Sequence, residues 1–207
     1  MPEHKMVFVD VDTQADFMLP TGSLYVPGAE QIIPNLARLV EFARGHDVPV
    51  VSSADAHSLS DDEFQQFPPH CVKGTAGQKK LPETLLAKWT VLPNEQQPEP
   101  AAEEIARCRQ WILEKQKFDL FTNIHAAFLF EKLDAGQYVV FGVATEYCVR
   151  EAVLGLLQQG RPVTVVEDAI RAIEAGSGQA ALQEMQNAGA RLLRTQELLR
   201  ETVPAAS

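Results

Sequence analysis

The sequence alternates between short apolar runs and amphipathic stretches, and this alternation restricts the fold more than any other feature. The apolar runs are rich in β-branched residues and nearly free of charge, as in strands that are covered on both faces of a sheet. We expect strands at residues 6–11, 48–52, 111–114, 138–142, 162–167 and, by a weaker pattern, 190–193. Amphipathic helical stretches lie between them at residues 32–43, 124–133, 149–157 and 179–188.

A repeated strand, helix, strand order predicts right-handed crossovers and a parallel sheet with helices on both faces. The expected fold class is therefore α/β, a doubly wound three-layer α/β/α sandwich. The chain has 207 residues, 45% of them hydrophobic, so we expect residues 1–207 to form one domain with a substantial core. The polar, proline-rich residues 93–104 predict an exposed excursion from that domain.

Composition excludes several classes of partner. The formal net charge is −10 and no basic run is longer than Lys79-Lys80, so we expect no nucleic-acid binding. No apolar run approaches the ~18 residues of a membrane span, and the N-terminal residues lack the apolar core of a signal peptide, which predicts a cytoplasmic protein without membrane partners. The three cysteines, Cys71, Cys108 and Cys148, form no close pairs, which argues against a disulfide framework or a zinc ribbon.

Chemically active side chains follow the ends of four expected strands. Ligands of such sheets bind outside the carboxyl ends of the strands. Asp12 follows the first strand, Asp55 and His57 the second, Lys115 the third and Cys148 the fourth. Each alone has a plain explanation, because an Asp can cap a turn, a Lys can be solvated and a Cys can fill a core. Their joint placement favours a functional site.

Cys148 stands near the first turn of an expected helix in FGVATEYCVREAV, residues 141–153. Unpaired backbone N–H groups and the helix dipole favour the thiolate there, and a neighbouring Lys lowers the thiol pKa further. A carboxylate can accept the proton, and the N–H groups can bind an oxyanion. We expect the small residues Gly142 and Ala144 to let a substrate approach this backbone. An Asp, Lys and Cys trio suits acyl transfer from an amide.

Three segments resemble the motifs of the isochorismatase-like cysteine hydrolases, and of the nicotinamidases in particular. Residues 12–17, DTQADF, resemble D-x-Q-x-D-F, and residues 115–121, KQKFDLF, resemble K-x-x-Y-D-x-F. Residues 142–149, GVATEYCV, resemble G-x-A-T-D-x-C-V. The likeness extends from about residue 5 to residue 175, and the last motif is quite specific.

This resemblance assigns roles to individual residues. It implies that Asp12 is the catalytic acid and base, that Lys115 completes the triad and that Cys148 is the nucleophile. It also implies a Rossmann-like, isochorismatase-like sheet of six mainly parallel strands, and a cis peptide bond before Ala144. The backbone N–H groups of Ala144 and Cys148 would form the oxyanion hole.

The motif spacing also decides between neighbouring acids and neighbouring lysines. Asp10 lies at the same strand end as Asp12, and Lys117 lies two residues after Lys115. Alignment with the family motifs places Asp12 and Lys115 in the catalytic positions. Asp10 is then expected to be a buried or structural acid, and Lys117 a solvated neighbour.

A candidate metal site lies next to the expected triad. Asp55 and His57 alternate in an extended segment, so both side chains can point the same way, and His70 can return from the following loop. A carboxylate with two imidazoles is a usual ligand set for Zn²⁺, Fe²⁺ or Mn²⁺, although short D-x-H runs are also common in loops. The resemblance favours a metal, because nicotinamidases carry D-x-H and a later histidine before a cysteine, here His70-Cys71.

The resemblance implies a divalent cation, Zn²⁺ first with Fe²⁺ and Mn²⁺ as alternatives, that holds a pyridine nitrogen of the substrate. Glu63 occupies a place where some nicotinamidases supply a further ligand. The chain departs from the family at Ala56, where an aromatic residue is common, and at Phe67, which stands in place of a Trp. Phe17, Phe67 and Tyr147 are the residues expected to enclose an aromatic ring, although aromatic residues in loops are as often packing. Cys71 and Cys108 are expected to be structural.

Three hypotheses follow for the function. The first is a metal-dependent nicotinamidase-type amidase acting on a small-molecule amide. The second keeps the triad but changes the substrate to another small amide or carbamoyl compound, with a structural metal site. The third is a non-catalytic binding module, against which the three filled triad positions argue. Self-association is common among the relatives, so a homo-oligomer is compatible with the resemblance, but no pattern in the chain decides the oligomeric state.

Overall fold

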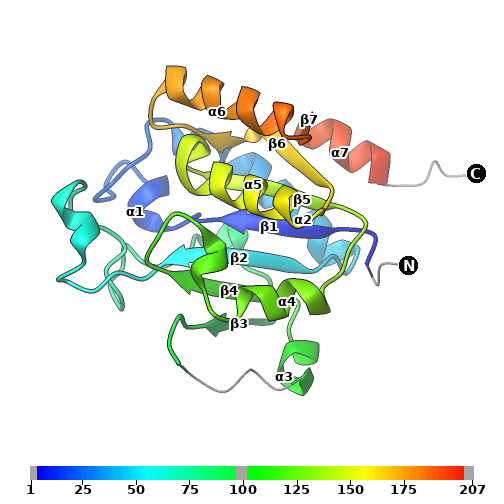
Figure 1. Ribbon diagram of the computed structural model, residues 1–207, viewed down its shortest axis with the longest axis horizontal. Coiled ribbons are helices and arrows are strands. Elements are labelled where there is room, and N and C mark those ends of the chain that lie inside the picture. Colours follow the sequence, from blue (N-terminus) through cyan, green and yellow to red (C-terminus); the bar gives the residue numbers. More distant parts are fainter. Residues whose placement is uncertain (1–3, 97–101, 203–207) are drawn as a thin grey trace, which may run out of the picture.

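In the computed structural model, which describes residues 4–96 and 102–202, seven parallel strands form one open sheet (Figure 1). The strands are β1 (Val7–Val11), β2 (Val50–Asp55), β3 (Trp89–Leu92), β4 (Gln110–Lys115), β5 (Tyr138–Val143), β6 (Val163–Arg171) and β7 (Arg191–Leu193). Their order across the sheet is β3-β4-β2-β1-β5-β6-β7, and each pairing is parallel. The predicted α/β class is confirmed, with seven strands in the described part of the chain where six were expected.

Helices cover both faces of the sheet and make the predicted three layers. The helices are α1 (Ala15–Met18), α2 (Ile33–Gly45), α3 (Ala102–Arg107), α4 (Ala126–Lys132), α5 (Arg150–Gln158), α6 (Ala175–Asn187) and α7 (Thr195–Thr202). Shorter helical turns are η1 (Ala29–Ile32), η2 (Asp62–Gln65), η3 (Pro82–Thr84), η4 (Leu120–Thr122) and η5 (Thr145–Val149). Helices α4, α5 and α6 pack on the face that contains Val9, whereas α2 and α7 pack on the face that contains Phe8. Both faces are therefore buried, which explains the unbroken apolar runs.

The sequence located the strand centres better than the strand ends. Strand β2 continues to Asp55 and β6 to Arg171, each beyond its predicted end. The last residues of β2 and β6 include polar side chains, so the apolar pattern did not place them in the strands. Strand β3 was missed altogether, because it is a four-residue edge strand whose Trp89 and Val91 are exposed, so it has no buried apolar pattern.

The predicted excursion at residues 93–104 falls partly outside the described residues, since 97–101 are not among them. Strand β3 ends just before it, and α3 begins at Ala102. Within residues 4–96 and 102–202, no helix combines the length and the apolar character needed to cross a bilayer.

The order of the strands brings four carboxyl ends together at one edge of the sheet. Strands β4, β2, β1 and β5 are consecutive neighbours, and Asp55 at the end of β2 pairs in register with Lys115 at the end of β4. The chain leaves β1 toward β2 and later returns to the other side of β1 with β5. A reversal of this kind is where ligands bind in open α/β sheets.

Gly142 in β5 lies opposite Val11 in β1 and has a φ of 119°. A Cβ atom at this position would lie 2.0 Å from the carbonyl oxygen of Val11. Gly142 therefore has a structural role that its small size alone did not indicate. The glycine is required because its backbone conformation and the close approach of β1 both exclude a side chain.

Gly142→Ala should lower the free energy of unfolding by more than about 3 kcal/mol, because it adds an atomic overlap to an unfavourable φ. Gly160→Ala is a matched control, since Gly160 also has a positive φ of 73° but has no atom of the described residues within 4 Å of the position that a Cβ would take. The control should cost about 1 to 2 kcal/mol. Denaturant unfolding measures both values, and equal losses would contradict the packing argument.

Candidate active site

Four residues from separate strand ends meet at the carboxyl edge of the sheet. Asp12 follows β1, Asp55 ends β2, Lys115 ends β4, and Cys148 lies in the turn η5 after β5. All four side chains are buried. The sequence placed these groups on one rim, and the structure brings them into contact.

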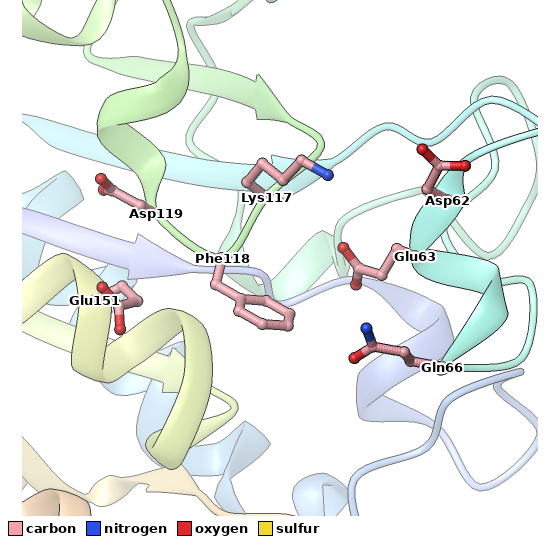
Figure 2. Close-up of a pocket in the computed structure, with 7 residues that line it drawn as sticks. All are labelled: Asp62, Glu63, Gln66, Lys117, Phe118, Asp119 and Glu151. Carbon is pink, nitrogen blue, oxygen red and sulfur yellow. The ribbon is translucent and has the colours of Figure 1, made fainter.

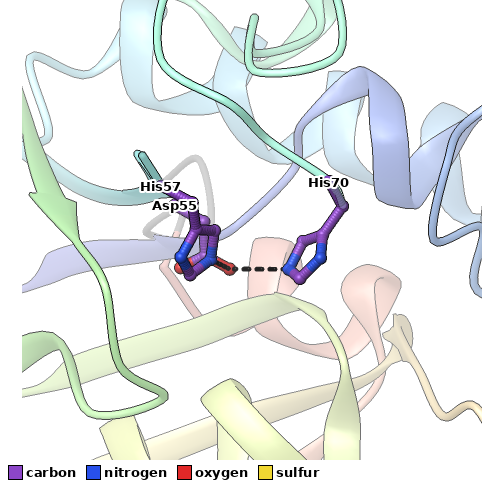
Figure 3. A group of neighbouring side chains, drawn as sticks. All are labelled: Asp55, His57 and His70. Carbon is purple, nitrogen blue, oxygen red and sulfur yellow. Dashed lines mark ion pairs between the residues drawn. The ribbon is translucent and has the colours of Figure 1, made fainter. Parts of the chain in front are cut away.

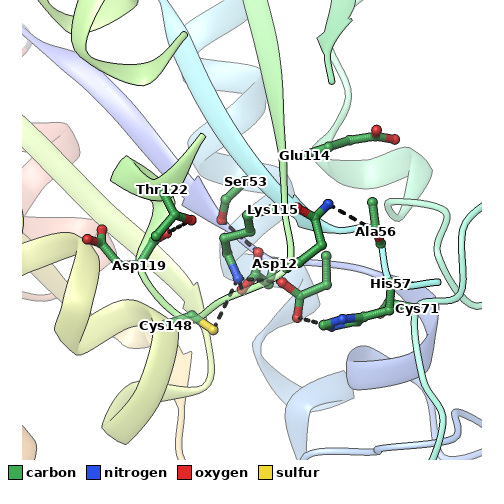
Figure 4. Close-up of polar contacts among 12 residues, drawn as sticks. Asp12, Ser53, Ala56, His57, Cys71, Glu114, Lys115, Asp119, Thr122 and Cys148 are labelled. Atoms are coloured by element: carbon green, nitrogen blue, oxygen red, sulfur yellow. Dashed lines mark hydrogen bonds and ion pairs between the residues drawn. The ribbon is translucent and has the colours of Figure 1, made fainter. Parts of the chain in front are cut away.

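The Lys115 ammonium lies at the centre of this group (Figure 4). Its Nζ atom is 2.5 Å from Asp55 Oδ1, 2.8 Å from Asp12 Oδ2 and 3.4 Å from Cys148 Sγ. The contact between Lys115 and Asp12 is an ion pair and not an aligned hydrogen bond. Within the described residues, Oδ2 of Asp12 has no hydrogen-bond partner. One cation therefore holds two carboxylates and the thiol within reach of one another.

Burial and charge set the protonation of the thiol. Burial raises the pKa of Cys148 well above its usual value; Lys115 lowers it, and Asp12 and Asp55 raise it again. The pKa of Lys115 is raised well above its usual value, because the nearby carboxylates outweigh burial, which alone would lower it. These shifts favour a neutral thiol beside an ammonium. Burial and the two acids thus oppose the effect of the helix terminus and the lysine, which the sequence predicted to favour the thiolate.

The two acids differ in their protonation. Burial raises the pKa of Asp12, and the attraction of Lys115 offsets only part of that rise. Burial also acts to raise the pKa of Asp55, but Lys115 and His57 outweigh it, so that the pKa is lowered overall. Asp12 is thus the carboxylate of the pair that accepts a proton more readily, as an acid and base beside a thiol requires.

Asp55, His57 and His70 form the second cluster of the site (Figure 3). The Oδ2 atom of Asp55 lies 3.7 Å from His57 Nε2 and 3.9 Å from His70 Nε2. These separations are too long for hydrogen bonds. The three atoms belong to a set that lies within 4.8 Å of one another, which is the spacing of ligands around a common centre.

The histidines are oriented for metal binding by contacts on their other nitrogens. His57 Nδ1 lies 3.0 Å from Asp61 Oδ2, and His70 Nδ1 lies 2.9 Å from the Pro68 carbonyl oxygen. When each acceptor takes a proton from Nδ1, the neutral ring keeps its lone pair on Nε2. His57 Nε2 is buried and has no hydrogen-bond partner within the described residues. The donor set therefore fits a divalent cation.

The electrostatic field at this cluster also favours a cation. Burial lowers the pKa of His57, but Asp55 and Asp61 raise it more, to about 9. The negative field that favours a proton on the ring also favours a metal ion, which would compete with that proton for Nε2. Burial raises the pKa of Glu63, whose Oε1 lies 3.7 Å from His70 Nε2, so this residue is at the edge of the cluster.

An inner cavity opens beside Cys148 and is walled by aromatic rings. Phe17, Phe67 and Tyr147, all named from the sequence, line it together with Phe118. The centroid of the Phe67 ring is 6.0 Å from that of Tyr147, and the Phe118 ring is 5.1 Å from Tyr147. The cavity also contacts Asp55, Glu63, His70 and Ala144, and its apolar lining is completed by Leu24, Val26, Val143 and Ile173.

Sequence reasoning missed part of this lining. Phe118 could have been found, because it lies within the motif that begins at Lys115. Leu24, Val26 and Ile173 follow α1 and β6 without any recognisable pattern.

A larger outer cavity of about 390 Å³ adjoins the inner one, because both include Glu63 and Phe118 (Figure 2). Asp62, Gln66, Lys117, Asp119 and Glu151 complete its lining. The expected solvated position of Lys117 is confirmed, since it is exposed at this rim and not beside Cys148.

The remaining sequence expectations concern structural residues. Asp10 is buried and paired with Lys80 at 3.0 Å, which confirms it as a buried acid outside the group around Cys148. Cys71 is fully buried, and burial raises its pKa far above the usual value, which makes it an unreactive thiol. Cys108 is half-buried against the core. The peptide bond between Val143 and Ala144 is cis, as the resemblance implied.

Comparison with known proteins gives a consistent result. The family model of the isochorismatase domain matches residues 6–197. The nicotinamidase of Escherichia coli is 26% identical over 214 residues, which cover 93% of this chain and 95% of that protein. An Arabidopsis thaliana protein named "Probable inactive nicotinamidase" is 25% identical over 191 residues, covering 86% of this chain and 87% of that protein. A zinc complex of Pyrococcus horikoshii pyrazinamidase has a TM-score of 0.75 at 26% identity, covering 92% of this chain and 99% of that one.

The geometry predicts that purified protein carries about one divalent metal ion per chain, as a three-residue site with one ligand set does. His57→Ala and His70→Ala should each reduce that content at least tenfold, measured by elemental analysis. His46→Ala is the control, because His46 is exposed at the end of α2. Full metal content in both cluster variants would contradict the assignment.

Proposed function

The chain belongs to the isochorismatase family, and on that premise we propose that it is a cysteine amidohydrolase that converts nicotinamide to nicotinic acid and ammonia. The observation that carries the proposal is the contact of Lys115 with both Asp12 and Cys148 at the wall of an aromatic cavity, with a carboxylate oxygen of Asp12 within 4.8 Å of Cys148 Sγ. Family membership alone would not suffice, since one relative is named as inactive. In this chain the acid, the ammonium and the thiol are all present and buried together.

The first half of the reaction forms a thioester. Asp12 accepts the thiol proton of Cys148 as sulfur attacks the carboxamide carbon, while Lys115 stabilises the charges that develop on both. The backbone N–H groups of Ala144 and Cys148 are proposed to donate to the oxyanion, and both residues line the cavity. The tetrahedral intermediate collapses when Asp12 returns the proton to the nitrogen, so that ammonia leaves and the acyl group stays on sulfur.

The second half of the reaction releases the acid. Asp12, again a carboxylate, takes a proton from water as the water oxygen attacks the thioester carbon. The carbon–sulfur bond then breaks, and the proton returns to sulfur. The neutral resting thiol that burial favours is thereby restored.

The metal cluster and the aromatic rings support an aromatic substrate. A divalent cation held by Asp55, His57 and His70, with Zn²⁺ as the first candidate and Fe²⁺ or Mn²⁺ as alternatives, would supply a Lewis-acidic contact for a ring nitrogen. Glu63 is proposed as an additional ligand, because it lies beside His70. Phe17, Phe67 and Tyr147 are proposed to contact the ring. Phe67 lines the cavity, and its ring centroid lies 6.4 Å from that of His70. We propose that it takes the place of the Trp that is common in the family.

Cys148→Ala should reduce ammonia release from nicotinamide by about 10⁴-fold or more, because no other group replaces the sulfur. Asp12→Asn should cost about 10² to 10⁴-fold, since an amide cannot accept the proton. Cys108→Ala is the matched control, a half-buried thiol packed against the core outside the cavity, and it should keep its activity. Full activity of the Cys148→Ala variant would refute the proposal.

A substrate panel separates this function from the rival in which the same triad acts on another small amide. Nicotinamide and pyrazinamide should be hydrolysed with a higher kcat/KM than aliphatic amides or carbamoyl compounds, because the cavity offers aromatic walls. Treatment with a chelator should reduce the rate for nicotinamide, and added metal should restore it. Equal rates for aliphatic amides, unaffected by chelator, would favour the rival.

A further inference from the structure

Ser53 holds one oxygen of the Asp12 carboxylate. Ser53 lies in β2, and its hydroxyl group donates to Asp12 Oδ1 at 2.7 Å. Both side chains are buried, so bulk water does not compete for this oxygen. The other oxygen, Oδ2, is the one that lies 2.8 Å from Lys115 Nζ. The two oxygens of Asp12 therefore have different partners, and Oδ2 is the one that contacts the ammonium beside Cys148.

Ser53 is itself fixed through its backbone. Its carbonyl oxygen accepts hydrogen bonds from the Asp12 N–H at 3.3 Å and from Lys80 Nζ at 3.1 Å. Lys80 is anchored in turn by its ion pair with Asp10. Asp12 has a φ of 47°, which a residue other than glycine adopts only when its surroundings hold it there. The hydroxyl of Ser53 is thus a rigid donor beside a constrained carboxylate.

We propose that Ser53 is a positioning residue for the hydrolysis, which keeps Oδ2 of Asp12 turned toward the thiol proton of Cys148. The inference rests on the proposed function. Without the hydroxyl, Oδ1 becomes a buried acceptor with no partner among residues 4–96 and 102–202, and the carboxylate is free to turn toward the Lys115 ammonium with either oxygen. Proton transfer from sulfur then loses its alignment. Substrate binding should be unaffected, because Ser53 is not among the residues that line the inner cavity.

Ser53→Ala should lower kcat for nicotinamide by about 10- to 100-fold, the range that the loss of a hydrogen bond to a charged group gives. KM should stay within about twofold of its original value, since the cavity wall is unchanged. Ser53→Thr keeps the hydroxyl donor and should restore most of kcat. Ser53→Cys keeps the size of the side chain with a weaker donor and should give an intermediate value.

Ser52→Ala is the matched control for a purely structural role. Ser52 is the preceding residue of the same strand, is equally buried, and donates to a buried carboxylate, Asp10 Oδ2, at 2.9 Å. Its loss should lower the melting temperature about as much as the loss of the Ser53 hydroxyl, but it should leave kcat nearly unchanged. A circular-dichroism melt of each variant shows that the compared proteins are folded.

The outcomes separate the inference from the function on which it rests. Low kcat and unchanged KM in Ser53→Ala, with rescue by threonine and a near-normal Ser52→Ala, support the positioning role. The positioning role is overturned if Ser52→Ala and Ser53→Ala have equal kcat values, or if Ser53→Ala changes only KM. The proposed function is retained in either case, provided that the unchanged protein releases ammonia. An unchanged protein that releases no ammonia from nicotinamide overturns the proposed function and the positioning role together.

Discussion

The ammonium of Lys115 is the charge on which the arrangement of the site depends. Two carboxylates and a thiol from three other strand ends lie within 3.4 Å of its nitrogen. In a buried site the two acids would repel each other strongly without a cation between them. Removing one partner of a buried ion pair lowers stability by much more than the net free energy that the intact pair contributes. Lys115 therefore links the side chains at the carboxyl ends of β1, β2 and β4.

Asp55 belongs both to the group around Lys115 and to the cluster with His57 and His70. One of its oxygens contacts Lys115, and the other faces the Nε2 atoms of His57 and His70. Under the proposed function, the group that would bind the ring of the substrate and the group that would attack its carboxamide thus share one carboxylate. Gln14 fixes the position of this residue, because its amide group accepts from the Asp55 N–H at 2.7 Å and donates to the Asp55 carbonyl at 2.9 Å. A second residue of the motif around Asp12 therefore has a defined structural task.

The sequence predicted the elements that carry these groups better than their protonation. Apolar runs revealed the central strands because they are covered on both faces, and the polar residues at their ends marked the site. Strand β3 was missed because an edge strand lacks a buried pattern, and the lining contributed by Leu24, Val26 and Ile173 was missed because it depends on packing between distant segments. The protonation of Cys148 was hard to predict for a related reason, since the depth of its burial is a property of the fold. The use of Gly142 also required coordinates, because the close approach of Val11 cannot be read from one strand alone.

The most direct test of the account is to identify the atom that carries the acyl group during turnover. Protein mixed with nicotinamide and quenched rapidly in acid can be digested and examined by mass spectrometry. The account predicts a nicotinoyl adduct on the peptide that contains Cys148, which disappears after the substrate is consumed. An adduct on another residue, or steady turnover with no adduct under conditions that preserve thioesters, would contradict the central claim that the buried thiol beside Lys115 is the nucleophile.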